Sequence, residues 1–253
     1  SDLCAALVKG ARRRGARIVE HTRVEGIVTE SGRVKAVETD RGTVRCDAVA
    51  ICAGLWSRDV AAMGGARAPV WPCEHYYLLT GPIDGIEGNL PTLSDHDGHL
   101  YIRDDSGGLL VGCFEPDARA LAPEQIGEDF AFQLLPEDWE HLEPMMHNAL
   151  HRLPALEHAP VRMLLNGPES FTPDGSFLLG ETAETRGLYL GCGMNSVGVA
   201  TGGGAGFALA QTIVNGAPNA DLGEADAKRF PECFDSIAAL TARAPEVLGR
   251  HYD

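Results

Sequence analysis

A glycine-rich run between two apolar segments, over residues 188–213, constrains the fold of this chain more than any other feature. Leu188–Leu190 is short and apolar, which is typical of a buried strand, and Phe207–Ile213 is typical of a helix that ends near Gly216. The run between them, Gly191–Gly206, predicts a glycine turn that enters this helix. An order of strand, turn and helix places backbone N–H groups at a helix N-terminus, where they can meet negative charge on a ligand.

Two interpretations of these glycines stay open at the level of sequence. The turn differs from the GxGxxG dinucleotide fingerprint, because Ser196 stands where the third glycine would be. Residues without a side chain let a flat ring or a phosphate approach the main chain. They also let a helix pack closely against its neighbours, and spacing alone does not choose between ligand binding and packing.

The N-terminal quarter of the chain predicts one helix and several short strands. Asp2 can cap a helix over residues 2–14 that Gly15 ends. The β-rich runs that follow predict a small antiparallel meander. These runs are Arg17–Glu20, Val24–Thr29, Val34–Thr39 and Thr43–Arg45. The run Ala48–Cys52 is apolar throughout, which predicts a parallel strand covered on both faces that leads into a helix over Trp56–Met63.

The middle of the chain predicts a second sheet and a helix that covers it. The expected strands are Tyr76–Thr80, Leu100–Arg103 and Leu109–Phe114. Residues 122–153 favour a helix, with a buried stripe of Trp139, Leu142, Met146, Leu150 and Leu153. Asn166–Gly175 then predicts a rigid loop between two strands, in which Glu169 and Asp174 can make polar contacts.

The chain shows no internal repeat and no linker, so its lobes are expected to be interleaved. We predict an α/β fold in which residues 1–66 and 160–220 form one part. Residues 67–159 form a second lobe on a mixed, largely antiparallel sheet, and residues 221–253 form a C-terminal tail or helix.

Composition argues against several classes of partner. The 36 acidic and 21 basic residues give a formal net charge of −15, which disfavours nucleic acid and anionic membranes as partners. Most proteins use such an excess only for solubility, although it can also attract a cationic amine. The seven cysteines are scattered without a CxxC pair, which disfavours a disulfide framework and a metal site. No apolar run is long enough for a membrane span, so a cytoplasmic setting is expected.

A third segment carries residue types that suit an amino-acid substrate. His75 lies in the run Trp71–Tyr77, and Tyr101 and Arg103 follow along the chain. An amino-acid site needs a cation or hydroxyl donor for the carboxylate and an apolar wall for the amine. The alternative is that His75 and Tyr101 are ordinary core or rim residues of a sheet.

Five segments together resemble one enzyme superfamily. They are LCAALVKGARRRGARIVEHTRVEGI, VETDRGTVRCDAVAICAGLWSRDV, VWPCEHYYLLT, NGPESFTPDG and YLGCGMNSVGVATGGGAGFALAQTIVNG. In this order and spacing they resemble the glycine oxidase and D-amino-acid oxidase superfamily, and most closely its dimethylglycine and sarcosine dehydrogenase branch. The resemblance covers nearly the whole chain.

The resemblance implies FAD as cofactor and an incomplete Rossmann-like FAD/NAD(P)-binding domain interleaved with the substrate lobe. It places the main chain of Val24 on the adenine side and Ala53, Gly54 and Trp56 along the cofactor. The turn beside the isoalloxazine ring would be Gly193, Met194, Asn195, Ser196, Val197 and Gly198. The family's first strand–GxGxxG–helix segment and its flavin-attaching histidine have no counterpart in this sequence. The chain also opens at Ser1 without methionine, so upstream sequence is expected.

The chemistry implied by the resemblance is oxidative demethylation of a secondary or tertiary amine such as dimethylglycine or sarcosine. A hydride equivalent passes from the carbon beside nitrogen to flavin N5, and water hydrolyses the iminium to formaldehyde and a demethylated amine. His75 and Tyr101 match positions where this branch places a histidine and a tyrosine beside the substrate.

The resemblance also implies partners and leaves two alternatives. An electron-transfer flavoprotein or oxygen would accept the electrons, and a folate-binding domain would follow the final Asp253 in this branch. One alternative is a glycine or D-amino-acid oxidase that acts on primary amines. The other is a flavin-binding regulatory subunit that turns over no amine.

Overall fold

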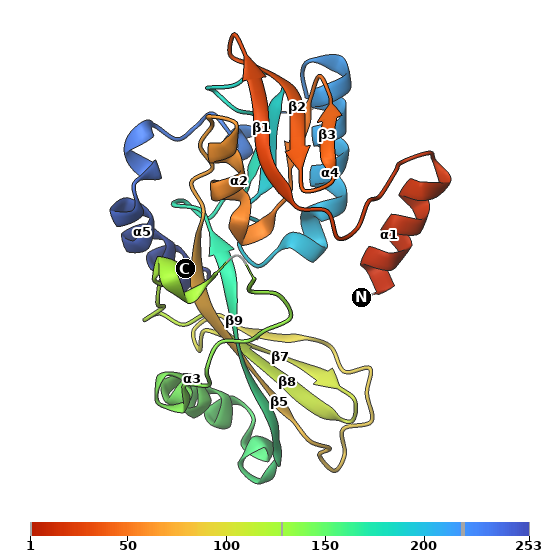
Figure 1. Cartoon of the computed structure of the whole chain (residues 1–253). Helices are drawn as coiled ribbons and strands as arrows, with labels where there is room; N and C mark the ends of the chain where they lie inside the picture. The colour runs from red at the N-terminus through yellow and green to blue at the C-terminus, as the bar shows by residue number, and fades with distance from the viewer. Residues whose placement is uncertain (1, 128, 219–220, 253) are drawn as a thin grey trace.

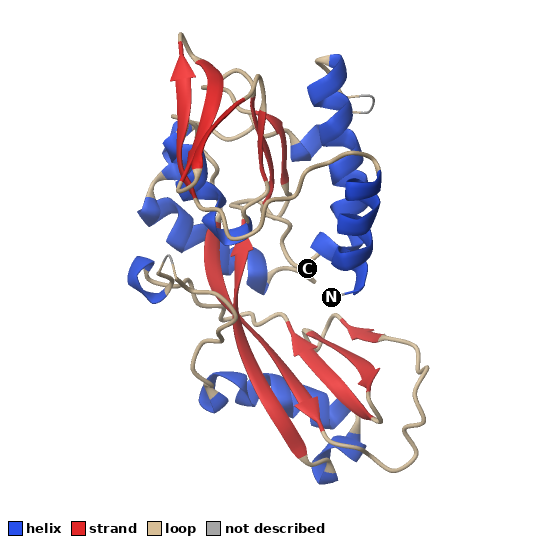
Figure 2. Cartoon of the chain, turned by 45° about the vertical axis from the view of Figure 1, so that its right-hand side comes forward, coloured by secondary structure: helices blue, strands red, loops and turns tan. Residues whose placement is uncertain are grey.

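The computed structural model describes residues 2–127, 129–218 and 221–252, which form an α/β fold with three sheets (Figures 1 and 2). We call them the meander sheet (β1-β2-β3), the central sheet (β10-β11-β4) and the large sheet (β6-β7-β8-β5-β9). The meander and central sheets lie in the upper part of Figure 1 and most of the large sheet lies below them. The predicted fold class is confirmed, with a largely antiparallel second sheet.

The N-terminal region contains one helix and the predicted meander. Helix α1 spans Asp2–Arg13 and has no buried residue. Strands β1 (Val24–Glu30), β2 (Arg33–Thr39) and β3 (Gly42–Arg45) pair antiparallel in that order. The strand predicted over residues 17–20 is wrong, because this segment has no hydrogen-bonded neighbour strand in the described chain, and a strand needs such a partner for its backbone groups.

The central sheet contains the predicted parallel pair. Strand β4 (Val49–Ile51) lies parallel to β11 (Leu188–Cys192), and β10 (Leu178–Glu181) pairs antiparallel with β11. The buried side chains of Ile51, Leu188 and Leu190 form a core with the meander and α2 (Ser57–Met63), which follows the short helix η1 (Gly54–Trp56). The expectation that both faces of β4 are covered is wrong, since Ala50 and Cys52 are exposed and only one face packs on this core.

Helix α4 (Gly198–Asn215) follows β11 and ends at Gly216, which adopts the left-handed conformation with φ of 77°. The strand, turn and helix predicted from the glycine run are therefore confirmed. The helix begins earlier than the apolar pattern indicates, so the glycines between residues 202 and 206 lie inside it.

The large sheet is built on two long strands. Strand β5 (Trp71–Thr80) pairs antiparallel along its whole length with β9 (Val161–Phe171), which is an edge strand. Strands β8 (Gly108–Cys113), β7 (Leu100–Asp105) and β6 (Leu93–Asp95) complete the sheet on the other side of β5. The loop predicted from Asn166 is wrong up to Phe171, because an edge strand tolerates Pro168, which has no N–H to donate.

Helix α3 (Trp139–Arg152) covers the large sheet, and Leu142, Met145 and Ala149 are buried against it. Its N-terminus is capped by Asp138, whose side chain accepts a hydrogen bond from the backbone of His141. The predicted stripe is core as expected except for Trp139, whose side chain is exposed. The helix does not extend back to residue 122, because Gly127 and Pro136 interrupt that segment, whose described residues form η2 (Pro123–Gln125) and no other helix before α3.

The C-terminal region packs on the long strand pair. After η3 (Pro154–His158), which precedes β9, the remaining elements are η4 (Gly223–Ala225), η5 (Glu232–Asp235) and α5 (Ile237–Gly249). Leu240 and Leu248 of α5 are fully buried against Trp71 and Phe171. The predicted division at residues 66, 159 and 220 stays a prediction. Among the described helices, none has the length and apolarity that crossing a bilayer requires.

Candidate functional site

A groove of about 640 Å³ runs along the C-terminal ends of β4 and β11. Its wall is formed by α1 on one side, by the start of α4 on another, and by residues of β9. The lining residues are Leu3, Cys4, Leu7, Cys52, Gly54, Glu169, Ser170, Gly191, Cys192, Gly193, Met194, Asn195, Ser196, Gly198, Val199, Ala200, Gly202 and Gly203. The edge beyond the carboxyl ends of parallel strands is where open α/β sheets bind their ligands, so this groove is the candidate site.

The turn between β11 and α4 is held in an unusual backbone conformation. Gly193, Asn195 and Ser196 all have positive φ values, of 64°, 46° and 69°. Asn195 is buried, its Oδ1 accepts a hydrogen bond from the backbone N–H of Thr172 at 2.9 Å, and its amide donates to the carbonyl of Gly193 at 2.6 Å. The side chain of Asn195 therefore fixes the turn to the end of β9.

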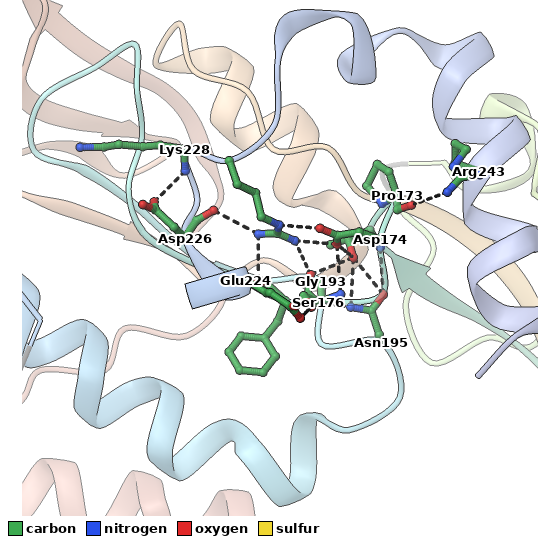
Figure 3. A network of polar contacts seen from close by, with 12 residues as sticks. Pro173, Asp174, Ser176, Gly193, Asn195, Glu224, Asp226, Lys228 and Arg243 are labelled. Atoms are coloured by element: carbon green, nitrogen blue, oxygen red, sulfur yellow. Dashed lines mark hydrogen bonds and ion pairs between the residues drawn. The ribbon is translucent and has the colours of Figure 1, made fainter. Parts of the chain in front are cut away.

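A second polar network holds the segment after β9 next to this turn (Figure 3). Arg229 binds both carboxylate oxygens of Asp174 at 2.7 and 2.8 Å and donates to the carbonyl of Ser176 at 2.6 Å. The Thr172 hydroxyl donates to the same carbonyl at 2.8 Å. A bidentate arginine–carboxylate pair strongly fixes the relative position of its two side chains. Asp174 therefore has a structural role in the segment after β9.

The start of α4 presents free backbone to the groove. No side chain caps its N-terminus, so the first N–H groups of the helix are available to a ligand. A Cβ added at Gly202 or Gly203 would meet no described atom within 4 Å, so neither glycine is needed for packing within the described chain. Each interior glycine costs a helix about 1 kcal/mol relative to alanine. Because close packing does not explain this cost, the geometry favours ligand approach over the packing interpretation.

His75 lies on β5 between two carboxylates. Its Nδ1 is 3.3 Å from Oε2 of Glu115, and its Nε2 is 3.7 Å from Oε2 of Glu169. Glu115 is itself buried and accepts the backbone N–H of Tyr76 at 3.0 Å. Burial lowers the pKa of His75, but the hydrogen bond and charge of Glu115 together with the charge of Glu169 outweigh burial, and the net pKa is raised.

The raised pKa of His75 predicts a stability that depends on pH. Its folded-state pKa lies above the ordinary value of about 6.5, so the folded state holds this proton more tightly than the unfolded state. The resulting stabilisation is complete below about pH 6.5 and is lost as the pH rises through the folded-state pKa. We expect the loss in free energy of unfolding caused by His75→Gln, measured by urea titration, to be larger at about pH 5.5 than at about pH 9. An equal loss at both pH values would contradict this prediction.

Glu169 connects His75 to the turn before α4. It lies on β9 opposite Cys73, and its Oε2 accepts a hydrogen bond from the hydroxyl of Ser196 at 2.6 Å. The same oxygen is the one that faces His75. One carboxylate therefore links the run Trp71–Tyr77, which contains His75, to the glycine turn before α4.

Tyr101 lies on β7 opposite Gly112, and a side chain at residue 112 would overlap its ring. The rings of Tyr101 and His75 both pack against Phe114, with centroid distances of 6.1 and 5.0 Å. Burial, followed by the charge of nearby Cys113, raises the pKa of Tyr101 to about 12. The two candidate catalytic residues thus pack against the same aromatic side chain, and Tyr101 is a neutral hydroxyl at physiological pH.

The remaining predicted cofactor residues do not all line the groove. Gly54 lines the groove, and Ala53 packs on the core of the central sheet beside it. Val24 begins β1 opposite Thr39. Trp56 lines a separate pocket of about 120 Å³ that also contains Trp71. Val197, which precedes α4, is partly exposed. The roles assigned to these residues stay predictions.

Two residues of the site escape sequence reasoning. Phe114 and Glu115 follow a buried strand without any motif of their own, and only the pairing of β5 with β8 brings them to His75. A buried-strand pattern that ends in a carboxylate is the one available signal. Within the described residues, no cluster of three His, Cys, Asp or Glu side chains is arranged to hold a metal ion.

The residues present fit the ring end of FAD. The groove has the volume of ordinary ligand pockets, about 300–1,000 Å³. Its walls combine apolar side chains with glycines whose missing Cβ atoms leave room for a flat group, and the uncapped helix offers N–H donors for electron-rich ring atoms. These are the properties that the isoalloxazine part of the cofactor requires.

Comparison with known proteins agrees with this geometry. The family model DAO, described as FAD dependent oxidoreductase, matches residues 1–212. A mitochondrial pyruvate dehydrogenase phosphatase regulatory subunit of Mus musculus is 38% identical over 100% of this chain and 29% of its own length. Mitochondrial sarcosine dehydrogenase of Mus musculus is 37% identical over 98% of this chain and 27% of its own length.

A solved structure shows the same fold. The crystal structure of glycine oxidase from Geobacillus kaustophilus has a TM-score of 0.69 and 26% identity, and the match covers 91% of this chain and 58% of that chain. The chain spans less than a third of the length of the two curated relatives named above.

Proposed function

The chain belongs to the FAD-dependent oxidoreductase family, and from this premise we propose that it takes part in the oxidation of a secondary or tertiary amine of the sarcosine or dimethylglycine kind. The observation that carries the proposal is the position of His75, held between Glu115 and Glu169 next to the turn at residues 193–198. The similarity to a sarcosine dehydrogenase supports an N-methylated substrate. FAD, when bound, supplies the acceptor for two electrons.

The protein's own groups would orient the amine. Leu3, Leu7, Met194 and Val199 supply apolar walls, which suit a small N-methyl group. His75 and Tyr101, which both pack against Phe114, supply hydrogen-bonding groups for the polar end of the substrate. Positioning of this kind accounts for a large part of rate enhancement when the reacting carbon needs no protein nucleophile.

An absorption experiment tests the proposed function. The protein is incubated with FAD, desalted and mixed anaerobically with sarcosine, dimethylglycine or glycine. We expect the flavin bands to persist after desalting and to bleach with the N-methylated amines faster than with glycine. Faster bleaching with glycine would favour an oxidase of primary amines. Retained flavin that none of the amines bleaches would favour the regulatory-subunit alternative, which the similarity to a phosphatase regulatory subunit makes worth testing.

An electron-transfer flavoprotein is the acceptor that we propose for the reduced enzyme. After bleaching with an N-methylated amine, air is admitted in the absence of any other acceptor. Slow return of the flavin bands in air and fast return with an electron-transfer flavoprotein would support this acceptor, whereas immediate return in air would identify oxygen. A folate-binding domain that takes up the one-carbon product stays a proposal.

Tyr101→Phe tests the role of the tyrosine hydroxyl. The change removes one hydrogen-bonding group and keeps the ring that packs on Phe114. We expect flavin reduction by an N-methylated amine to slow about tenfold, since a hydrogen bond to a charged group contributes about 1.5–3 kcal/mol. Anaerobic stopped-flow absorption measures the rate. Tyr189→Phe, which changes a tyrosine of the central sheet outside the groove, is the control, and an unchanged rate in Tyr101→Phe would remove its hydroxyl from the mechanism.

A further inference from the structure

The charge of the groove comes from a single side chain. Among the described residues that line it, Glu169 alone carries a formal charge, and the others are apolar, glycine or neutral polar residues. Neither lysine nor arginine is among them. A groove whose walls are apolar and whose one charge is negative suits a ligand that is apolar apart from one cationic centre.

The two carboxylates beside His75 differ in their exposure to solvent. The side chain of Glu115 is 3% exposed and that of Glu169 is 33% exposed. Glu115 is hydrogen-bonded to His75 and to the backbone of Tyr76, so its oxygens are committed inside the protein. Glu169 is the carboxylate that a molecule in the groove can reach.

The charges around His75 leave one negative charge for a ligand. When His75 is protonated, it neutralises one of the two neighbouring carboxylates, and the nearer contact is with Glu115 at 3.3 Å. Glu169, at 3.7 Å, then contributes the excess negative charge at the groove wall. A single ligand cation would bring the group to neutrality, which is the condition under which partly buried charges are stable.

One hydrogen bond orients Glu169 and leaves the other carboxylate oxygen free. Its Oε2 accepts from the hydroxyl of Ser196 at 2.6 Å and faces His75. Within the described part of the chain, Oε1 receives no hydrogen bond. A carboxylate held by one oxygen and open at the other is prepared to accept a charge-assisted hydrogen bond.

We propose that Glu169 is the residue that binds the cationic nitrogen of the amine substrate, with Ser196 as the group that orients it. This inference rests on the proposed function, and it deepens that function by naming the group that selects amines. Because Ser196 belongs to the turn that precedes α4, the carboxylate holds the nitrogen next to that turn.

Two ligands of the same shape test the proposal by equilibrium binding. Betaine carries a trimethylammonium group, and 3,3-dimethylbutanoate carries a tert-butyl group in the same place without the charge. Titration calorimetry on the FAD-loaded protein measures both dissociation constants, for the wild type and for Glu169→Gln, which keeps the size of the side chain. Betaine has no N–H, so it tests the charge of Glu169 alone, and we expect the wild type to bind it at least about tenfold more tightly than the neutral ligand, as one close ion pair in a partly buried site predicts.

Glu169→Gln is expected to abolish this preference, while Ser196→Ala reduces it by a smaller factor of about three because the carboxylate remains but loses its orienting donor. Glu157→Gln removes the same charge from an exposed residue of η3 and is expected to leave the preference unchanged. A preference for betaine that persists in Glu169→Gln would overturn the proposal. Equal binding of the two ligands by the wild type would overturn it without the need for any variant.

The binding test is separate from the test of the proposed function. If N-methylated amines bleach the flavin but Glu169→Gln retains the preference for betaine, only the assignment of Glu169 fails. If no amine bleaches the flavin and the wild type still prefers betaine through Glu169, the amine oxidation fails and the cation site stands.

Discussion

Replacing His75 by Gln is expected to slow flavin reduction by an N-methylated amine about a hundredfold. The imidazole lies 3.3 and 3.7 Å from the two carboxylates, and a histidine side chain can change its charge near neutral pH. Groups that move or hold a proton at the reacting amine typically contribute about 10²–10⁴ in rate. Glutamine keeps a polar side chain but cannot carry the charge.

Anaerobic stopped-flow absorption at saturating amine measures this effect without interference from the electron acceptor. His147→Gln is the matched control, since this histidine is exposed on α3 and is expected to have no effect. A reduction rate in His75→Gln within about twofold of the wild type would exclude a role for the imidazole in the slow step. Recording the flavin spectrum of each variant before mixing separates a loss of rate from a loss of cofactor.

Gly193→Ala is expected to destabilise the fold by about 3 kcal/mol and to weaken cofactor retention. Residue 193 has a φ of 64°, which a side chain makes unfavourable, and a Cβ there would lie 2.6 Å from Cγ2 of Thr172 and 2.9 Å from Cγ1 of Val70. Strain of this backbone conformation and overpacking each cost about 1–3 kcal/mol. Thr172 cannot retreat easily, because its hydroxyl and its backbone N–H are both hydrogen-bonded.

Urea unfolding gives the change in stability, and the flavin absorbance that remains after desalting gives cofactor retention. Gly204→Ala is the matched control, because it adds the same methyl group inside α4 where a Cβ meets nothing within 4 Å. That change is expected to stabilise the helix by up to about 1 kcal/mol. Equal effects of the two substitutions would show that Gly193 is not needed for the turn.

The parts of the fold that the sequence predicts are those set by local pattern. The apolar strand at Leu188, the turn and the helix that ends at Gly216 follow from residue order, because each element has its own short-range signal. The meander follows from turn residues between alternating apolar positions. Residue type and family resemblance identify His75 as a candidate, and the structure brings it to the glycine turn through Glu169.

The parts that the sequence does not predict depend on pairing between distant segments. Residues 166–171 carry a glycine and a proline, which indicate a loop, yet the long partner β5 makes them a strand. Residues 17–20 have the pattern of a strand and remain unpaired in the described chain. Glu115 can be recognised as a site residue only in the fold, because β8 places it against His75, which is 40 residues away in sequence.

The continuous pairing of β5 with β9 has a consequence for how the site can move. Trp71 pairs with Phe171 near the central sheet and Leu79 pairs with Met163 at the far end, so one two-stranded rod runs through both halves of the molecule (Figure 1). His75 and Glu169 are both carried on this rod, which resists bending because flexing it would break ladder hydrogen bonds. A hinge between the two halves would have to bend this ladder, so we expect a substrate to enter by motion of segments outside it.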